Sequence, residues 1–401
     1  MRPDAGTTVP AEGSHPCVVL CLNVGSSSLK AAVRDPHLRL HVDVAGLDGT
    51  TARVTTTGPH GPAEEEPLPG GWTGALDGVA QALEQHGLWP AVVAHRIVHG
   101  SAALRGARHA DERLLDQLRR ESARDPLHLP RQLSVVEAAR IRWSDADQVL
   151  VPDSGFHGTL PGEAVTLPVP PEARAAGLRR WGFHGLAVQS VVDLLPGLGA
   201  AVVVHLGSGC SVTAVQHGLS RHTTMSLSPA GGVPSLTRSG DLDPEVVLQL
   251  VDLHGGSLAA VRDLLNRRSG VAGLSGGTTD VRELLADGGA AADLALRVFV
   301  RDVAMAVAGA VTTLEGWDAV VFTGGIGVHS EEIRERVCAA LLPLRGGARG
   351  LWGSPSQRLV ATGVRVLTVP VDEEAVMDRL TRQALSRHAR AGAADPAAVQ
   401  R

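Results

Sequence analysis

The chain has 401 residues, of which 44% are hydrophobic and 20% are charged, and its net charge is −5 at pH 7. This length exceeds one ordinary hydrophobic core, so we expect two domains. The composition excludes a disordered or collagen-like chain, and the mild acidic balance excludes a basic surface for nucleic acid and a polybasic membrane patch.

The N-terminus and the cysteines indicate a location. Residues 1–16 lack the apolar core of a signal peptide and are expected to form a disordered leader. No stretch reaches about eighteen uninterrupted apolar residues, so we expect no membrane-spanning helix. The four cysteines, Cys17, Cys21, Cys210 and Cys338, form no CxxC pair, which argues against a disulfide framework and a zinc site. We therefore predict a cytoplasmic protein.

The first half of the chain predicts a hairpin followed by further strands and helices. Residues 17–24 form an apolar run, a Gly-Ser turn follows, and residues 29–33 are apolar again, which is typical of a β-hairpin. Pro, Gly and three successive Glu in 58–71 favour a surface loop. Further strands are expected at 38–44 and 91–98, and helices at 74–87, 110–123 and 130–143.

A second hairpin of the same design lies far downstream. Residues 201–206 are apolar, Gly207-Ser208-Gly209 makes a turn, and 211–215 returns. This internal duplication predicts two related α/β domains, with a linker between 151 and 177. Later elements are expected as helices at 295–314, 330–342 and 373–387 and strands at 318–322 and 364–369.

Residue usage singles out the first hairpin. The chain contains one Lys, Lys30, and two Asn, and Asn23 lies in the same segment, VLCLNVGSSSLKAAV. Gly-Ser turns present backbone N–H groups and hydroxyls that converge on a phosphate, although one such turn alone is more often a plain tight hairpin. The TGGIG segment ends a strand and opens a helix, yet it matches neither a Rossmann nor a P-loop motif.

Ten blocks in order make the sequence resemble the acetate kinase family, in the sugar kinase, heat-shock ATPase and actin superfamily. They span residues 17 to about 385 and read CLNVGSSSLK, AHRIVHG, DPLHLP, VPDSGFHGTLP, RRWGFHG, HLGSGCS, TRSGDLDP, GLSGGTTDVREL, VFTGGIG and PVDEE.

The resemblance implies an α/β fold of two duplicated ribonuclease H-like (actin-like ATPase) domains, with mixed five-stranded sheets around an interdomain cleft. The expected boundaries are 17–153 plus 374–392 for the first domain and 154–373 for the second, with a flexible tail at 393–401. It also implies a homodimer formed through the second domain, and no nucleic-acid or membrane partner.

The implied activity is that of an acetate kinase, with reversible in-line phosphoryl transfer from ATP to acetate, giving acetyl phosphate and ADP. The cofactors are then ATP/ADP and Mg²⁺, with Mn²⁺ as the alternative metal. Two alternatives stay open: a propionate or butyrate kinase of the same family, and a nucleotide-binding regulatory homologue with weakened catalysis.

The motifs assign site residues by resemblance. The expected catalytic residues are Asp153, Arg96, Arg238, His184 and His128. The expected substrate-binding residues are Arg96, Val98, Leu127, Phe183 and Pro229. The expected nucleotide-binding residues are Lys30, Ser26, Ser28, His205, Leu206, Gly207, Ser208, Gly209, Asp280, Val281, Arg282, Gly324, Gly325, Ile326 and Gly327. Asn23 and Glu373 are expected at the metal.

The chemistry of these residue types agrees with phosphoryl transfer. Guanidinium forks match both phosphoryl and carboxylate oxygens. A carboxylate substrate is ionised at neutral pH and needs no general base. Asp153 is therefore expected to support the metal or the hydrogen-bond network of the site rather than to act as a base. Without the motif, His184 is equally well explained as a core histidine.

Several positions depart from the family pattern. Ser208 replaces the usual Asn, Val328-His329 follow TGGIG in place of Glu-Asn, and Leu129 and Leu236 replace Asn and Gly. Ser208 offers one hydroxyl in place of an amide, so we expect a phosphate contact to be lost or bridged by water. Val328-His329 lie on the adenosine side and predict altered nucleotide affinity or base choice.

Overall fold

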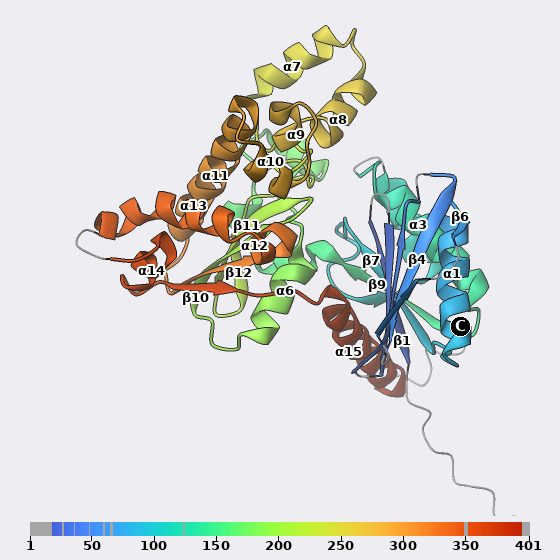
Figure 1. The fold of residues 1–401 in the computed structure, drawn as a ribbon. Helices are drawn as coiled ribbons and strands as arrows, with labels where there is room; N and C mark the ends of the chain where they lie inside the picture. The colour runs from blue at the N-terminus through green and yellow to red at the C-terminus, as the bar shows by residue number, and fades with distance from the viewer. Residues whose placement is uncertain are drawn as a thin grey trace, which may run out of the picture.

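The computed structural model describes residues 18–394 apart from 26–27, 36, 48, 59–60, 65–66, 123–124 and 349–351. Two β-sheets lie in separate halves of the molecule, each flanked by helices (Figure 1). The expected leader, and residues 395–401 of the expected tail, lie outside the described residues. None of the described helices combines the length and apolar character that a membrane span requires.

The first sheet has nine strands within the described ranges, in the order β5-β4-β3-β2-β1-β7-β9-β8, with β6 paired to β4. β1, β2 and β3 pair antiparallel, and β7 and β9 extend the sheet from β1 in parallel. The strands are β1 (Val19–Val24), β2 (Ser28–Asp35), β3 (His37–Ala45), β4 (Thr51–Gly58), β5 (Gly61–Glu64), β6 (Leu68–Pro69), β7 (Val92–Ile97), β8 (Arg108–His109) and β9 (Asp147–Pro152).

The expectation of five strands in this sheet is wrong, although the core β3-β2-β1-β7-β9 is present. β4, β8 and β9 were not among the expected strands, and residues 58–71, expected as a loop, contain β5 and β6. Both short strands pair with β4. The open edge of β4 supplies backbone partners, and such pairing overrides the weak local preference of a Pro- and Gly-containing segment.

The second sheet repeats the core of the first. Its order is β12-β11-β10-β13-β14, with three antiparallel strands followed by two parallel ones. The hairpins β1–β2 and β10–β11 hold equivalent places, which confirms the duplicated fold. The strands are β10 (Ala200–Leu206), β11 (Cys210–Gln216), β12 (Leu219–Thr223), β13 (Ala319–Thr323) and β14 (Arg365–Thr368).

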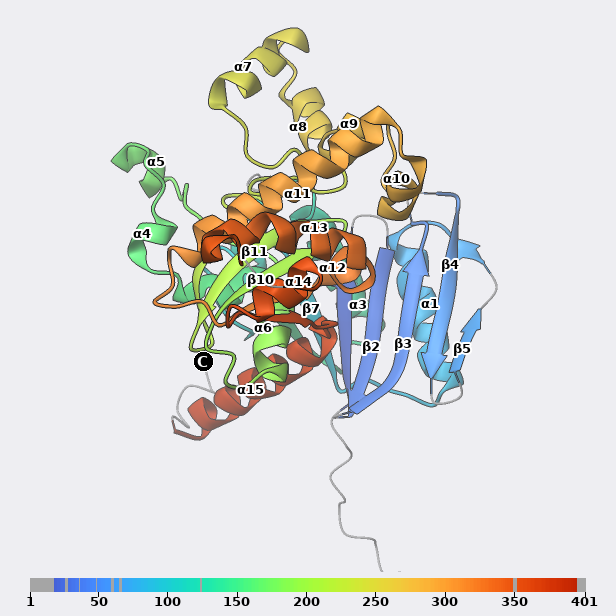
Figure 2. The ribbon, with the colours of Figure 1, turned by 60° about the vertical axis from the view of Figure 1, so that its left-hand side comes forward.

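Helices cover both faces of the first sheet because alternate residues of β1 are buried on opposite sides. Leu20 packs in the cluster that includes α1 and α3, whereas Cys21 packs with Met377 of α15 on the other face. The C-terminal helix thus returns from the second sheet to the first (Figure 2). These helices are α1 (Trp72–Gln85), α2 (Glu112–Glu121), α3 (Leu129–Arg142) and α15 (Glu373–Ala394).

The second sheet is covered in the same way. Val202 and Val204 pack against Phe299 of α11, and Val203 packs against Val188 of α6 on the opposite face. The helices here are α6 (Gly185–Leu194), α7 (Pro244–Leu253), α8 (Leu258–Arg267), α9 (Gly270–Ser275), α10 (Val281–Asp287), α11 (Ala290–Val311), α12 (Gly324–His329), α13 (Glu331–Leu341), α14 (Pro355–Val360) and the 3-10 helix η3 (Leu342–Ala348).

The segment expected as a linker, 151–177, holds the end of β9 and three short helical turns. They are η2 (Asp153–Thr159), α4 (Gly162–Val165) and α5 (Pro171–Ala175). The chain crosses from the first sheet toward the second after β9 and returns between β14 and α15. The domain boundaries stated above remain a prediction.

Candidate active site

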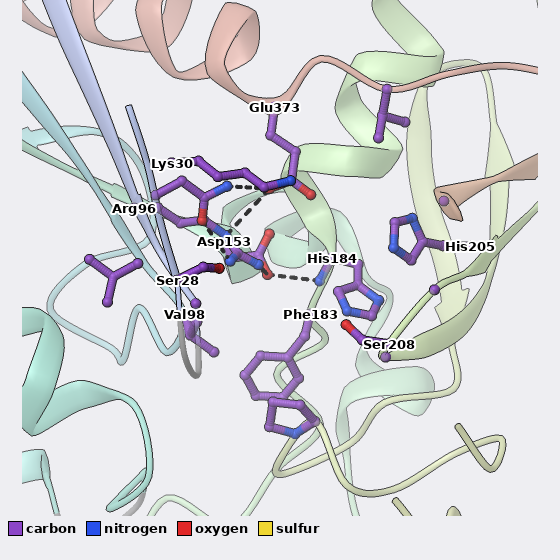
Figure 3. Close-up of a pocket in the computed structure, with 18 of the residues that line it drawn as sticks. Ser28, Lys30, Arg96, Val98, Asp153, Phe183, His184, His205, Ser208 and Glu373 are labelled. Carbon is purple, nitrogen blue, oxygen red and sulfur yellow. Dashed lines mark hydrogen bonds and ion pairs between the residues drawn. The ribbon is translucent and has the colours of Figure 1, made fainter. Parts of the chain in front are cut away.

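A cavity of about 580 Å³ lies between the two halves, bordered by the turns that follow β1 and β10 (Figure 3). In the close-up, Lys30, Arg96, Asp153 and Glu373 gather on one side, and His184, His205 and Ser208 lie on the other. The expected site residues that line the cavity are Asn23, Ser28, Lys30, Arg96, Val98, His128, Asp153, Phe183, His184, His205, Gly207, Ser208, Gly209, Pro229, Arg238, Gly324, Gly325 and Glu373.

The other expected site residues do not line this cavity. Leu206, Val281 and Ile326 pack in or against the second hydrophobic core, and Asp280 caps α10 and pairs with the exposed Arg282. Arg282 lowers the pKa of Asp280 to about 2. Leu127 and Gly327 also lie outside the lining, and Ser26 falls outside the described residues.

Five lining residues were not expected: Val24, Gly25, His41, Val371 and Glu374. Four of them lie in or beside the motif blocks CLNVGSSSLK and PVDEE, so the motifs themselves could have pointed to them. His41 carries no such signal, because only the pairing of β3 with β2 brings it to the cavity.

Arg96 on β7 is the centre of the polar network. Its Nη2 donates to Asp153 Oδ2 at 2.8 Å and its Nη1 donates to Asn23 Oδ1 at 3.0 Å. Glu373 Oε2 lies 3.7 Å from Nε. Burial acts to lower the pKa of Arg96, but the carboxylates of Asp153 and Glu373 outweigh it and raise that pKa. Arg96 is therefore a permanent cation with Asp153, Asn23 and Glu373 as its partners.

Asp153 is buried and holds the start of α6. Its carboxylate accepts the backbone N–H of His184 at 2.9 Å and of Leu186 at 3.1 Å, besides the bond from Arg96. A side chain at Gly185 would meet the Asp153 carbonyl oxygen at 2.1 Å, so glycine permits this approach. An aspartate at a helix N-terminus is also favoured by the helix dipole.

Glu373 begins α15 beside a second glutamate. Asn23 Nδ2 donates to Glu373 Oε2 at 3.1 Å and to Glu374 Oε1 at 3.3 Å. Burial raises the pKa of Glu373, and the charges of Asp153 and Glu374 add to this effect although Arg96 opposes it. Two carboxylates, of Asp153 and Glu373, thus pair with the Arg96 guanidinium, and Glu374 adds a third negative charge beside them.

The donor set fits a divalent cation that keeps most of its own ligands. Among the described residues, no group of three or more His, Cys, Asp or Glu side chains forms a ready-made metal site. Mg²⁺ commonly binds through one or two carboxylates, waters and substrate phosphates. Glu373, whose carboxylate lies in surplus negative charge, meets that requirement.

Two histidines lie together on the opposite wall. The rings of His184 and His205 have centroids 4.4 Å apart and are tilted by 41°. Burial, His205 and Arg238 lower the pKa of His184 well below its usual value, and burial lowers that of His205 to about 4. Both rings are therefore neutral at pH 7, and a neutral imidazole carries one N–H.

Arg238 is a largely buried cation with few partners. Its Nη1 donates to the Pro229 carbonyl at 3.4 Å, and no ion pair to Arg238 is found within the described part of the chain. Burial lowers its pKa, and Arg96 adds to this effect. A side chain at Gly209 would lie 2.8 Å from this Nη1, so glycine leaves room for the guanidinium. An anion in the cavity would supply the missing partner.

His128 reaches the cavity from the start of α3. Its Nδ1 lies 2.8 Å from Asp125 Oδ1, and Asp125 is 6% exposed. The pair fixes the ring so that the other nitrogen is left for a ligand.

One end of the cavity is apolar. Val98 and Phe183 belong to a cluster with Trp181 and Met225, all of them nearly inaccessible to solvent, and Leu227 packs against it. Pro229 also lines the cavity, but Leu127, expected as part of this wall, does not.

Comparisons with known proteins decide the family. A family model described as the Acetokinase family matches residues 18–377. The chain belongs to the acetokinase family. It is similar to an acetate kinase of Deinococcus deserti, with 37% identity over 92% of this chain and 98% of the relative. A propionate kinase of Edwardsiella piscicida is 34% identical over 89% of this chain and 94% of its own length.

Solved structures agree with this assignment. A propionate kinase of Francisella tularensis superposes with a TM-score of 0.83 at 26% identity, covering 91% of this chain and 99% of its own. An acetate kinase of Porphyromonas gingivalis gives a TM-score of 0.76 at 26% identity, covering 92% and 99%. The fold is thus the actin-like ATPase fold that the sequence predicted.

Membership of the acetokinase family fixes the reaction class. The protein is an ATP-dependent phosphotransferase that acts on small carboxylates, and it uses ATP/ADP and a divalent metal. The cavity agrees with this class, because cations and an apolar wall meet there.

Proposed function

We propose that this protein is an acetate kinase, which transfers the γ-phosphoryl group of ATP to acetate and releases acetyl phosphate and ADP in a reversible reaction. The observation that carries the proposal is the placement of Arg96 and Arg238 at one cavity beside the apolar side chains of Val98 and Phe183. Guanidinium groups match carboxylate and phosphoryl oxygens, and the apolar wall suits a methyl group.

The mechanism follows from these placements. The acetate carboxylate attacks without a general base, because it is ionised at neutral pH. Arg96 and Arg238 orient it and clamp the transferring group, and His184 donates a hydrogen bond to phosphoryl oxygens as charge moves onto them. His128 supports the substrate from the cavity edge.

The metal in this proposal is Mg²⁺, with Mn²⁺ as the alternative, held by Glu373 with Asn23 and positioned by Asp153. When bound, such an ion neutralises charge on the β- and γ-phosphates. The turn residues and glycines bind the nucleotide. They comprise Ser26, Ser28, Lys30, His205, Leu206, Gly207, Ser208, Gly209, Gly324, Gly325, Ile326 and Gly327, with Asp280, Val281 and Arg282 toward the adenosine.

Propionate kinase activity is the second candidate. Leu127 does not close the apolar wall, and a pocket of this kind discriminates one methylene by only about 1–3 kcal/mol. Val98, Phe183 and the buried Met225 behind them favour the smaller acid. The regulatory alternative is disfavoured because Arg96, Asp153, Arg238 and Glu373 are all retained at one cavity.

We also propose a cytoplasmic homodimer. α7 has no buried residue although six of its ten residues are Val or Leu. Leu248 is 59% exposed and Leu253 is 80% exposed. A second copy covering this apolar helix would remove it from water. Cys21, Cys210 and Cys338 are free thiols, as expected in a reducing compartment.

The direct test is ATP-dependent acyl phosphate formation, trapped as the hydroxamate, with acetate, propionate and butyrate. We expect acetate to give the highest kcat/KM. Arg238→Ala should lower kcat/KM by about a hundredfold or more, whereas the exposed Arg297→Ala on α11 should leave it unchanged. Equal rates for the two variants would reject the role of Arg238, and no product from any acid would reject the proposed function.

A further inference from the structure

His184 has a side-chain partner that the proposed mechanism does not use. Its Nδ1 lies 3.0 Å from the hydroxyl oxygen of Ser211. Ser211 is on β11, pairs in register with His205 on β10, and is 1% exposed. No water competes for a hydroxyl that is so deeply buried. The Ser211 hydroxyl and His184 Nδ1 are therefore hydrogen-bond partners of each other.

The other ring nitrogen of His184 is left for a ligand. Nε2 has no hydrogen-bond partner among the residues that the structure describes, and it is not one of their enclosed, unsatisfied polar atoms. A side chain placed at Gly209 would lie 3.1 Å from Nε2, so the glycine turn leaves this atom open. The ring lines the cavity near Ser208 (Figure 3).

The position of the single ring proton therefore matters. Arg96, Arg238 and His205 surround His184 with positive or potentially positive groups, and the ring is neutral. With the proton on Nε2, the ring donates to an anionic oxygen in the cavity. With the proton on Nδ1, the ring turns a lone pair toward that oxygen, which is repulsive.

We propose that Ser211 is a positioning residue that donates its hydroxyl proton in a hydrogen bond to His184 Nδ1 and so keeps the ring proton on Nε2, facing the transferring phosphoryl group. The inference rests on the proposed function for the identity of that group. His205 cannot replace Ser211, because its ring packs against that of His184 at a tilt of 41° and its own Nδ1 is buried without a partner among the described residues.

The kinetic test compares two buried serines. Ser211→Ala should lower kcat roughly tenfold, equivalent to one lost hydrogen bond in the transition state, with little change in KM for the carboxylate. The matched control is Ser220→Ala, because Ser220 makes the same type of bond, at 2.9 Å, to Nδ1 of His157 outside the cavity. Both variants should lose similar stability, but only Ser211→Ala should lose kcat. Equal kcat for the two would overturn the proposal.

Two further readouts separate positioning from general damage. In a double-mutant cycle, Ser211→Ala should have no further effect on kcat in a His184→Gln background; an equal tenfold loss there would contradict the proposal. Ring ¹⁵N NMR of histidine-labelled protein, assigned with His184→Gln, should find the proton on Nε2 at pH 8. A proton on Nδ1 would overturn the inference even if acetate kinase activity is found. Because the NMR result needs no turnover, it also stands if the proposed function fails.

Discussion

Asp153 Oδ2 accepts hydrogen bonds from both Arg96 Nη2 at 2.8 Å and the backbone N–H of His184 at 2.9 Å. One oxygen atom thus joins β7 of the first sheet to the start of α6, which packs on the second sheet. The single buried carboxylate of Asp153 thus positions Arg96 and His184, two catalytic candidates, relative to each other.

Replacing this carboxylate should damage both stability and activity. Asp153→Asn leaves Arg96 with a neutral partner in a buried setting, which typically costs about 3 kcal/mol, and a shift of Arg96 by about 1 Å can lower kcat a hundredfold. Urea unfolding and steady-state kinetics measure the two effects. The control is Asp193→Asn, because its ion pair with Arg379 is solvent-exposed and should contribute less than about 1 kcal/mol. Equal losses would contradict the prediction.

Glu373→Gln should stabilise the metal-free protein at neutral pH. The pKa of Glu373 is raised in the folded state, so between its unfolded and folded pKa values the folded chain binds more protons and stability falls as pH rises. The gain should therefore be present at pH 7–8 and disappear toward pH 4. The same change should abolish stabilisation by added Mg²⁺. Thermal unfolding without Mg²⁺ measures the expected gain in stability, and unfolding with Mg²⁺ measures the expected loss of stabilisation by the metal. A variant that is less stable than the wild type without metal would refute the prediction.

The sequence was sufficient for most strands of the repeated sheet core, although not for β9 and β12, and for most of the charged residues at the cavity. The apolar runs at 17–24 and 201–206 are short and bounded by Gly-Ser turns, which favours buried strands, and they contain β1 and β10. Four charged residues that lie far apart in the chain line the same cavity: Arg96, Asp153, Arg238 and Glu373. Only the order of the motifs predicted that they lie close together.

What could not be predicted depends on tertiary pairing. β4 to β6 form because an edge strand is available, and His41 reaches the cavity through the register of β3 with β2. Ser211 is the last residue of the motif block HLGSGCS, but its partner His184 is 27 positions away, in the block RRWGFHG. A local sequence pattern cannot predict a contact between residues so far apart in the chain.

Acid should destabilise the fold through buried neutral histidines. Burial lowers the pKa of His95, His157 and His205 to about 4, against about 6.5 in the unfolded chain. Between these pH values the unfolded chain binds more protons than the folded chain. The free energy of unfolding therefore decreases as the pH is lowered, by about 1.4 kcal/mol per pH unit for each ring. His95→Gln should reduce the slope of stability from pH 6.5 to 4.5, measured by urea unfolding, and the exposed His37→Gln should not. Equal slopes in all three proteins would exclude this cause.

Val98→Ala should shift the preference toward longer acids. Val98 is 6% exposed and packs with Phe183 and Met225, so shortening it opens room for about one more methylene. The ratio of kcat/KM for propionate over acetate should rise about tenfold. Val246→Ala, on the exposed helix α7, is the control. An unchanged ratio in Val98→Ala would place the acyl group elsewhere in the cavity.

The exposed face of α7 should hold two copies together. Leu248→Asp and Leu253→Asp place charge on a helix without a single buried residue, so they should leave the folded chain intact and disfavour association, because burying an unpaired carboxylate is costly. Analytical ultracentrifugation at micromolar concentration should find a dimer for the wild type and a monomer for the double variant. Ile141→Asp on α3, at an 83% exposed position, should remain dimeric. A double variant that stays dimeric would move the interface away from α7, and a wild-type monomer would reject the homodimer.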